Sequence, residues 1–380
     1  MAKNKTEVQP NILDYFEKRN LLGLIKAITE KDDIKELNKS IGAIDIGYGN
    51  TKYTLGVDEN SDLKTGIFPS ITPIAPTQSM TGGLLGQRNT KIIDIDGFNY
   101  EVGPDAELTA NNTETTRNLN ENYIFSEQYQ ALFYGALLYM EKEHYNYLIL
   151  GLPINFLYND KKLIEKFEGE HKINGKKFTI DKIIVVPQPL GGFYDIAINK
   201  EKYFDFVDEV NLIIDPGFLT FDFLVTSGLK PIENRSGALT GGMSRVLNTL
   251  AKSISTEISK DYNDHSAIDR AIRKPKKVKN PETGEYEPKR ILKVAGKEID
   301  LLPHIAKSAP TIQNSIGHMR NTVYSYDDID NIALVGGSEN VFEKKIREDI
   351  KRDILKTDDA IFSNVRGFWY IGVLEAIKNT

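Results

Sequence analysis

The sequence contains no cysteine, and its five histidines are scattered, with no pair spaced four residues apart. The lack of cysteine excludes disulfide bonds, thiolate metal ligands and a cysteine nucleophile, and the lack of paired histidines argues against a zinc site. Because a chain without cysteine suits a reducing compartment, we expect a cytoplasmic protein. No stretch approaches the roughly 20 apolar residues that cross a bilayer, and the N-terminus lacks the pattern of a secretory signal. We therefore expect no membrane partner.

An excess of positive charge is also lacking. The chain carries 48 basic and 54 acidic residues, a net charge of −6, so we expect no direct DNA binding. The patterns GxxxxGK[ST] and GxGxxG are absent, which argues against a P-loop and a Rossmann dinucleotide site. Hydrophobic residues make up 40% of the 380 residues, which is typical of a globular protein. A chain of this length is expected to form two domains.

Two stretches far apart in the chain share one plan. In residues 41–54 and again in residues 212–223, an apolar run ends in an aspartate, a tip containing glycine follows, and a second run leads away. The pattern predicts two β-hairpins, with Asp45 and Asp215 at matching positions. Either hairpin alone is equally consistent with a surface turn. Two such tips facing each other would hold a polyphosphate with backbone N–H groups, and the two aspartates would hold a hydrated Mg²⁺ ion.

Three further stretches are typical of a binding site. Prolines on both sides of Gln188 restrict the backbone there and present this side chain at the end of an apolar strand. A rigid turn with an exposed glutamine is the alternative. The small residues of 236–244 open a helix, and a helix start rich in glycine binds phosphate or lets a ring approach the backbone. The predicted strand 332–335 runs into Gly-Gly-Ser at 336–338, which suits the wall of a nucleotide site.

Other segments are less specific. Residues 1–40 form an N-terminal extension with apolar residues at helical spacing, which predicts one or two short helices that pack on the parent domain or contact a partner. Residues 273–293 are basic and are predicted to be a loop, either a solvated face or a contact with DNA or a polymer. We also expect helices over 126–143, 160–168 and 302–321, and strands over 91–95, 99–102 and 147–153.

The order of these elements resembles the actin-fold ATPases, which include actin, the sugar kinases and the heat-shock chaperone ATPases. The elements are, in order, the Asp45 hairpin, the Gln188 turn, the Asp215 hairpin, the loop at 335–337 and the helix start at 364–372. The resemblance covers the chain from Ile41 onward. Within that superfamily, residues 215–222 and 235–244 are most similar to the ParM-type plasmid-segregation actins of bacteria.

The resemblance implies an α/β protein with the actin-like (ribonuclease H-like) fold, in which two α/β domains flank a nucleotide cleft. Residues 41–200 would form the first domain, completed by 360–380, and residues 201–359 would form the second. The chain would cross between the domains near residue 195 and again near residue 360.

The resemblance also implies a site for ATP, or GTP, together with Mg²⁺. Asp45 and Asp215 would hold the metal through water, and Gln188 would orient the attacking water, since an amide cannot act as a base at neutral pH. These three are the expected catalytic residues. The expected nucleotide-binding residues are Gly47, Tyr48, Gly49, Asn50, Thr51, Lys52, Gly217, Phe218, Leu219, Thr220, Gly241, Gly242, Gly336, Gly337 and Ser338. Tyr48 and the pair Phe218-Leu219 depart from the family, which usually has small residues at these places.

The function implied is that of a nucleoside triphosphatase that polymerises into filaments and segregates plasmid DNA. Its partners would be further copies of itself and a DNA-bound adaptor protein at a plasmid centromere. A small-molecule kinase of the same fold is an alternative, although it would need a carboxylate base where Gln188 stands. A cell-shape actin homologue and a chaperone-like ATPase are further alternatives. The first would need a membrane-binding segment, and the second would need an appended substrate domain.

Overall fold

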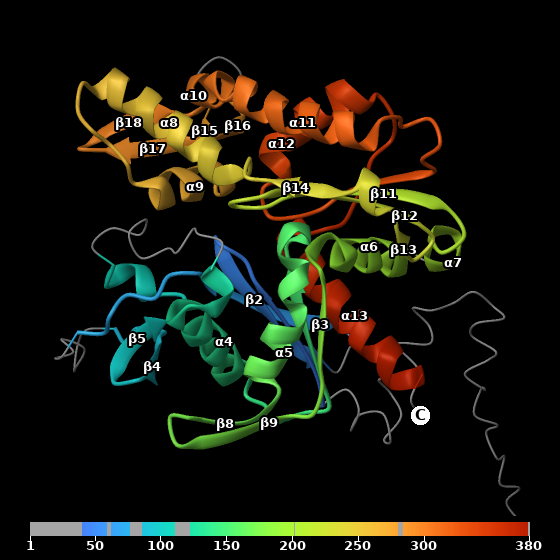
Figure 1. Cartoon of the computed structure of the whole chain (residues 1–380). Helices are drawn as coiled ribbons and strands as arrows, with labels where there is room; N and C mark the ends of the chain where they lie inside the picture. Colours follow the sequence, from blue (N-terminus) through green and yellow to red (C-terminus); the bar gives the residue numbers. More distant parts are fainter. Residues whose placement is uncertain are drawn as a thin grey trace, which may run out of the picture.

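The computed structural model describes residues 40–58, 62–76, 86–110, 122–200, 202–279 and 284–378. Within these residues the chain forms two large β-sheets, one in the lower half of Figure 1 and one in the upper half. The predicted extension over residues 1–40 lies outside the described residues, apart from its last residue. Among the described residues, no helix is long and apolar enough to cross a membrane.

The lower sheet has five strands in the order β10-β7-β1-β2-β3. The strands are β1 (Ile41–Ile46), β2 (Asn50–Val57), β3 (Leu63–Pro69), β7 (Tyr147–Leu152) and β10 (Ile183–Pro187). β1 pairs in parallel with β7 and antiparallel with β2. The first predicted hairpin is therefore confirmed as β1–β2, and the predicted strand over 147–153 is confirmed as β7.

Helices cover both faces of this sheet, and every residue of β1 is buried. Alternate side chains of a strand point to opposite faces. Ile44 accordingly packs in a core with α4 (Glu127–Met140), and Ile41 packs in a separate core with α13 (Ser363–Lys378). Burial on both faces explains why β1 reads as an almost continuous apolar run.

The upper sheet has six strands, in the order β13-β12-β11-β19-β20 with β14 beside β12. The strands are β11 (Val210–Pro216), β12 (Phe221–Ser227), β13 (Lys230–Pro231), β14 (Gly237–Leu239), β19 (Asn331–Leu334) and β20 (Leu355–Lys356). β11 and β12 are antiparallel neighbours, which confirms the second predicted hairpin. One face of the sheet packs on α8 (Met243–Ile258), α11 (Ala309–Val323) and α12 (Glu339–Ile350), and the other packs on α6 (Gln188–Asn199).

Smaller elements surround the two sheets. A hairpin of β4 (Lys91–Ile95) and β5 (Phe98–Val102) confirms two predicted strands, and β6 (His144–Tyr145), β8 (Gly169–Ile173) and β9 (Lys176–Ile180) form a separate sheet. The remaining α-helices are α5 (Asp160–Phe167), α7 (Tyr203–Phe206), α9 (His265–Arg273) and α10 (Leu302–Lys307). The 3-10 helices are η1 (Ala106–Leu108), η2 (Tyr123–Phe125), η3 (Ile154–Asn159), η4 (Glu233–Arg235) and η5 (Ala360–Phe362).

The single helix predicted over residues 302–321 is wrong, because the structure has two helices, α10 and α11, with a break at Ser308. Pro310 explains the break. Proline has no N–H group to donate to the carbonyl four residues earlier, so one continuous helix cannot run through this position. Proline is tolerated in the first turn of a helix, and Pro310 lies there in α11.

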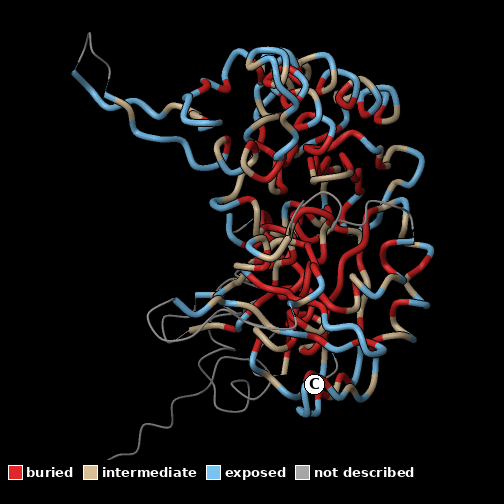
Figure 2. Tube along the Cα trace, turned by 90° about the vertical axis from the view of Figure 1, so that its left-hand side faces the viewer, coloured by how far each residue is buried: buried red, intermediate tan, exposed pale blue. Residues whose placement is uncertain are grey.

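The loop predicted over residues 273–293 is also wrong. The structure has an exposed hairpin of β15 (Lys276–Lys279) and β16 (Tyr286–Lys289), followed by a second hairpin of β17 (Ile291–Val294) and β18 (Lys297–Asp300). The β15–β16 hairpin extends away from the upper half in Figure 2 and is mostly exposed. Backbone pairing between strands needs no buried core, so a lysine-rich segment can form a ribbon that composition alone suggested was a loop.

Helices α6 and α13 lie against each other between the two sheets and meet at a pair of glycines (Figure 1). A Cβ atom at Gly367 would lie 1.7 Å from the carbonyl oxygen of Gly191. Helix α6 follows the last strand of the lower sheet, and α13 follows the last strand of the upper sheet. The chain therefore passes between the halves through these two helices, while the domain limits at residues 200 and 359 stay predictions.

Gly367→Ala tests this helix contact. Because the added Cβ would meet the Gly191 carbonyl, the helices must move apart, and we expect the free energy of unfolding to fall by about 1–3 kcal/mol. Urea denaturation measures the change. Gly317→Ala in α11 is the control, since a Cβ there meets nothing within 4 Å, and alanine in a helix stabilises by about 0.5–1 kcal/mol relative to glycine. A Gly367→Ala variant as stable as the control would contradict the helix packing.

Candidate functional site

The tips of the β1–β2 and β11–β12 hairpins line one cavity between the two halves. The N–H of Gly47 donates to the carbonyl of Asn50 at 3.1 Å, and the N–H of Gly217 donates to the carbonyl of Thr220 at 2.9 Å, so both tips close with the same turn. The cavity has a volume of about 50 Å³, and its lining comprises Asp45, Gly47, Tyr48, Gly49, Asn50, Lys52, Gln188, Asp215, Gly217, Phe218, Leu219, Thr220, Arg273, Gly336, Gly337, Ser338, Ile361 and Asn364.

Asp45 is buried at the end of β1 and is held by two partners. Lys52 lies directly opposite it on β2 and donates from Nζ to Oδ2 at 2.8 Å. Gln188, the first residue of α6, donates from Nε2 to Oδ1 at 2.7 Å. Since a carboxylate only accepts, this contact orients the Gln188 amide. The structure therefore joins two expected site residues, Asp45 and Gln188, that are 143 positions apart.

Asp215 is buried at the end of β11, on the other side of the cavity. Nδ2 of Asn364, from the first turn of α13, donates to its Oδ2 at 2.7 Å. The pKa of Asp215 is raised to about 6, mainly by burial and also by the charge of Asp45, while the hydrogen bond from Asn364 and the charge of Lys52 act in the opposite direction. The two expected metal-binding carboxylates are therefore close enough to repel each other.

Asp222 is a buried carboxyl that the sequence reasoning did not select. It lies opposite Asp215 in the β11–β12 pair, and its Oδ1 accepts from the backbone N–H of Ile154 at 3.1 Å. Its pKa is raised to about 7, mainly by burial and secondly by the charge of Asp215. Ile154 belongs to η3 of the lower half, so this carboxyl links the halves. The signal that could have identified it is an acidic residue inside the apolar run Phe221–Val225.

Phe218 crosses the cavity from the second tip to the first. A Cβ at Gly49 would lie 2.9 Å from the Phe218 ring, and the ring packs against the hydrophobic cores of both halves. An aromatic ring at this place therefore brings the two tips into direct contact.

Gly336 allows the third wall of the cavity to approach. Its φ is +84°, in the region that favours glycine. A Cβ at this position would also lie 2.0 Å from Oδ1 of Asp215. Gly337 and Ser338 follow it in the lining, so the loop expected to approach a nucleotide lies beside the second aspartate.

Three of the expected nucleotide-binding residues are not in the lining. Thr51 is buried beneath the first tip, where its Oγ1 lies 2.9 Å from Oγ of Ser70. Gly241 and Gly242 lie behind the second tip, and the N–H of Gly242 donates to the carbonyl of Leu219 at 3.1 Å. The start of α8 thus holds the second tip in place through backbone hydrogen bonds.

The lining also contains three residues that were not predicted as site residues: Arg273, Ile361 and Asn364. Arg273, from the end of α9, donates to the carbonyl of Gly337. Asn364 is the first residue of the predicted helix start at 364–372, and its Oδ1 is a buried acceptor with no hydrogen-bond partner among the described residues. An unpaired buried acceptor is costly, so a bound group that donates to Asn364 would relieve this cost.

The chemistry of these side chains suits a divalent cation held through water. Asp45 and Asp215 are hard oxygen ligands, the charge of Asp45 raises the pKa of Asp215, and a cation between them would reduce their repulsion. Within the described ranges, no group of three His, Cys, Asp or Glu side chains could hold a metal by itself. A Mg²⁺ ion bound here would therefore keep several of its own waters, as this ion usually does.

Asp222→Asn tests the buried pair. Both carboxyls have pKa values raised from 3.8, so the folded protein keeps protons that the unfolded chain has released. The free energy of unfolding therefore falls as the pH rises from about 4 to about 7, by up to about 1.4 kcal/mol per pH unit for each group. Asparagine keeps an acceptor for Ile154 and removes one titration, so we expect a shallower fall in urea denaturation between pH 4 and 8. Equal slopes in the two proteins would contradict this assignment.

Comparisons with known proteins were consistent with this architecture. Residues 43–191 match the family described as "Actin like proteins N terminal domain". No match was found among curated proteins. The chain is similar to the archaeal actin homolog Ta0583, with a TM-score of 0.67 and 18% identity over 88% of this chain and 99% of that one. The structure of Ta0583 in complex with ADP is similar with a TM-score of 0.63 and 17% identity, over 90% of this chain and 100% of that one.

A 15-stranded ParM filament from Clostridium botulinum is also similar, with a TM-score of 0.67 and 20% identity over 89% of this chain and 99% of that one. At such identities the solved structures establish the fold, and they confirm the prediction of two α/β halves around a cleft. The chain therefore has the actin fold, and its residues 43–191 match the N-terminal domain described for actin-like proteins.

Proposed function

We propose that this actin-like protein binds ATP with Mg²⁺ in the cleft, hydrolyses it and assembles into nucleotide-dependent filaments. The observation that carries the proposal is the pair of facing tips, with Asp45 and Asp215 buried on either side of one cavity and Gln188 hydrogen-bonded to Asp45. The similarity to an ADP-bound archaeal actin homolog supports the nucleotide. The similarity to subunits of a ParM filament supports self-assembly.

The two tips and the loop at Gly336 would bind the nucleotide. Backbone N–H groups at residues 47–50 and 217–220 would face the phosphates, and Lys52 would exchange its contact with Asp45 for a phosphate oxygen. The loop at 336–338 would lie against the adenosine, with Gly241 and Gly242 supporting the second tip from behind. ATP is proposed over GTP on likeness to the family.

Asp45 and Asp215 would hold the metal through water molecules, and Asn364 would orient the carboxylate of Asp215. When bound, Mg²⁺ supplies positive charge that offsets the negative charge of the phosphates. Gln188 donates its amide N–H to Asp45, which leaves its carbonyl oxygen as the acceptor for a water. The side chain would therefore orient the attacking water without taking its proton.

Nucleotide binding would require the halves to separate. Ligand pockets usually have volumes of about 300–1,000 Å³, whereas the cavity between the tips measures about 50 Å³. Phe218 and Gly49 would have to part, and helices α6 and α13 would absorb the rotation. One angle between the halves would give the two ends of the molecule complementary surfaces for a neighbouring copy. By setting this angle, the nucleotide would control assembly.

The cellular role that fits is segregation of plasmid DNA in the cytoplasm through a DNA-bound adaptor protein. The net charge of −6 is consistent with indirect DNA contact. A small-molecule kinase of this fold would need a carboxylate base at the place of Gln188, and Asp222 is engaged with Ile154 outside the cavity lining. These features favour the filament former over the kinase.

Two variants separate binding from hydrolysis. Asp215→Ala should lose most of the Mg²⁺-dependent affinity for ATP, because it removes a carboxylate next to the metal. Gln188→Ala should keep the affinity while hydrolysis falls 10- to 1,000-fold, or about 1.4–4 kcal/mol of barrier. Calorimetry with and without Mg²⁺ and a phosphate-release assay measure the two effects. Unchanged Mg²⁺-ATP binding by Asp215→Ala would rule out the paired-tip site, and equal losses in Gln188→Ala would make Gln188 a structural residue.

Assembly should follow the nucleotide. We expect light scattering to rise on addition of ATP above a critical concentration, and we expect filaments of Gln188→Ala to persist longer because the γ-phosphate contacts remain.

The exposed β15–β16 hairpin is a candidate contact peculiar to this chain, so Lys277→Glu should raise the critical concentration. If a non-hydrolysable analogue leaves all protein in the supernatant at tens of micromolar, roughly the range of weak contacts, the filament proposal fails.

A further inference from the structure

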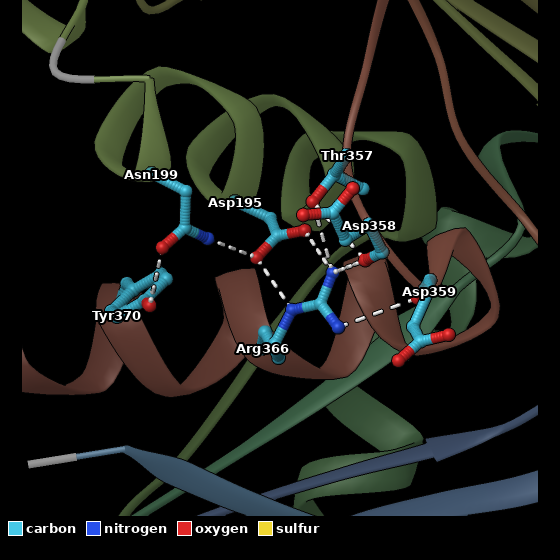
Figure 3. Close-up of polar contacts among 7 residues, drawn as sticks. All are labelled: Asp195, Asn199, Thr357, Asp358, Asp359, Arg366 and Tyr370. Atoms are coloured by element: carbon cyan, nitrogen blue, oxygen red, sulfur yellow. Dashed lines mark hydrogen bonds and ion pairs between the residues drawn. The ribbon is translucent and has the colours of Figure 1, made fainter. Parts of the chain in front are cut away.

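Arg366 and Asp195 form a buried ion pair between the two helices that connect the halves (Figure 3). Nε of Arg366 in α13 donates to Oδ1 of Asp195 in α6 at 2.8 Å, and Nη2 donates to Oδ2 at 2.6 Å. The Asp195 side chain is 0% exposed and that of Arg366 is 15% exposed. Two parallel charge-assisted hydrogen bonds fix the orientation of both side chains as well as their distance.

The same guanidinium also holds the segment through which the chain leaves the upper sheet. Nη2 donates to Oγ1 of Thr357 at 3.1 Å and to the carbonyl of Asp358 at 2.9 Å, and Nη1 donates to the carbonyl of Asp359 at 3.3 Å. This segment joins β20 to α13. Arg366 therefore fastens α6, α13 and the end of the upper sheet to one another.

Asp195 is held in turn from its own helix. Nδ2 of Asn199 donates to its Oδ1 at 2.7 Å, and the hydroxyl of Tyr370 in α13 donates to Oδ1 of Asn199 at 3.3 Å. Figure 3 shows this chain of contacts running along the interface between α6 and α13. The pair therefore belongs to a network that spans both connecting helices.

Both helices begin in the cleft. Helix α6 starts with Gln188, and Asn364 in the first turn of α13 holds Asp215. Asp195 lies seven residues after Gln188, about 10 Å along the helix, and Arg366 lies two residues after Asn364. Neither Asp195 nor Arg366 lines the cavity. The ion pair thus acts on the site only through the positions of the two helices.

We propose that the Asp195–Arg366 pair is a positioning device for hydrolysis, which sets the angle between α6 and α13 so that Gln188, the first residue of α6, faces the bound nucleotide. The proposal rests on the proposed ATPase function. When the halves rotate, residues 357–359 must move relative to α6. Arg366 resists that movement because it is hydrogen-bonded both to these residues and to Asp195 in α6. Loss of the pair would let the angle between α6 and α13 vary, so Gln188 would no longer be held in place for hydrolysis. The two hairpin tips, which bind the nucleotide, would keep their positions.

A second arginine in the chain provides a matched control. Arg235 also forms two hydrogen bonds to one aspartate, from Nη1 to Oδ2 of Asp328 at 2.6 Å and from Nη2 to Oδ1 at 2.9 Å, and it also donates to backbone carbonyls. Its side chain is 18% exposed, close to the value for Arg366. Its partners all lie within the upper half, and Asp328 is 57% exposed where Asp195 is 0% exposed. Arg235 therefore forms the same kind of hydrogen bonds in a more exposed pair, without the contact to α6 and α13.

The experiment compares Arg366→Lys and Arg235→Lys in the full-length protein, together with the double variant Asp195→Asn/Arg366→Gln, which leaves no unpaired buried charge. Single-turnover hydrolysis of ATP, the dissociation constant for a non-hydrolysable ATP analogue and the thermal midpoint are measured for each. We expect Arg366→Lys and the double variant to hydrolyse ATP at least 10-fold more slowly, with a dissociation constant for the analogue within about 3-fold of wild type. We expect Arg235→Lys to hydrolyse ATP at the wild-type rate, even if its thermal midpoint falls as far as that of Arg366→Lys.

Two results would overturn the proposal in distinguishable ways. In the first, the wild type hydrolyses ATP, and Arg366→Lys and the double variant either hydrolyse it as fast as Arg235→Lys or lose binding and hydrolysis in proportion. The pair is then only structural, and the ATPase function stands. If the wild type itself neither binds the analogue nor hydrolyses ATP, the proposed function fails and the positioning role fails with it.

Discussion

Burial of carboxyl groups at the seam between the two halves is the constraint on which the rest of the structure depends. Asp45, Asp215 and Asp222 are all buried, and a buried carboxylate is strongly unfavourable unless other groups stabilise it. Lys52 and Gln188 stabilise the first, while an α13 asparagine and a backbone N–H of η3 stabilise the others. Each partner comes from a different element, so satisfying these carboxyls requires those elements to converge on one place.

Glycine makes that convergence sterically possible. A side chain at Gly336 would collide with the carboxylate of Asp215, and one at Gly367 would collide with α6. The opposite effect operates at Phe218, where a large ring crosses from one tip to the other and contacts both cores. Close backbone approach behind the cavity and an apolar contact across it therefore hold the two halves together from two sides.

The same geometry connects the cleft to the end of the upper sheet. Helices α6 and α13 start at the cavity, cross each other at Gly191 and Gly367, and are tied by Arg366 to the end of the upper sheet. In the proposed function, a nucleotide bound in the cleft would thus alter the angle between the halves. In the proposed function, that angle is the property that a neighbouring copy in a filament would detect.

The sequence by itself determined the local elements: both hairpins, the strands at 91–95 and 147–153 and the helix after residue 126 follow from apolar periodicity and turn residues. It also marked most of the cavity, because aspartates and glycines at strand ends are local signals. Only the tertiary structure revealed that Arg273 and Asn364 line the cavity and that Asp222 is buried beside Asp215. Asn364 contacts a residue 149 positions away, and Asp222 one 68 positions away. Such pairings arise when two sheets pack around shared helices, which no local pattern encodes.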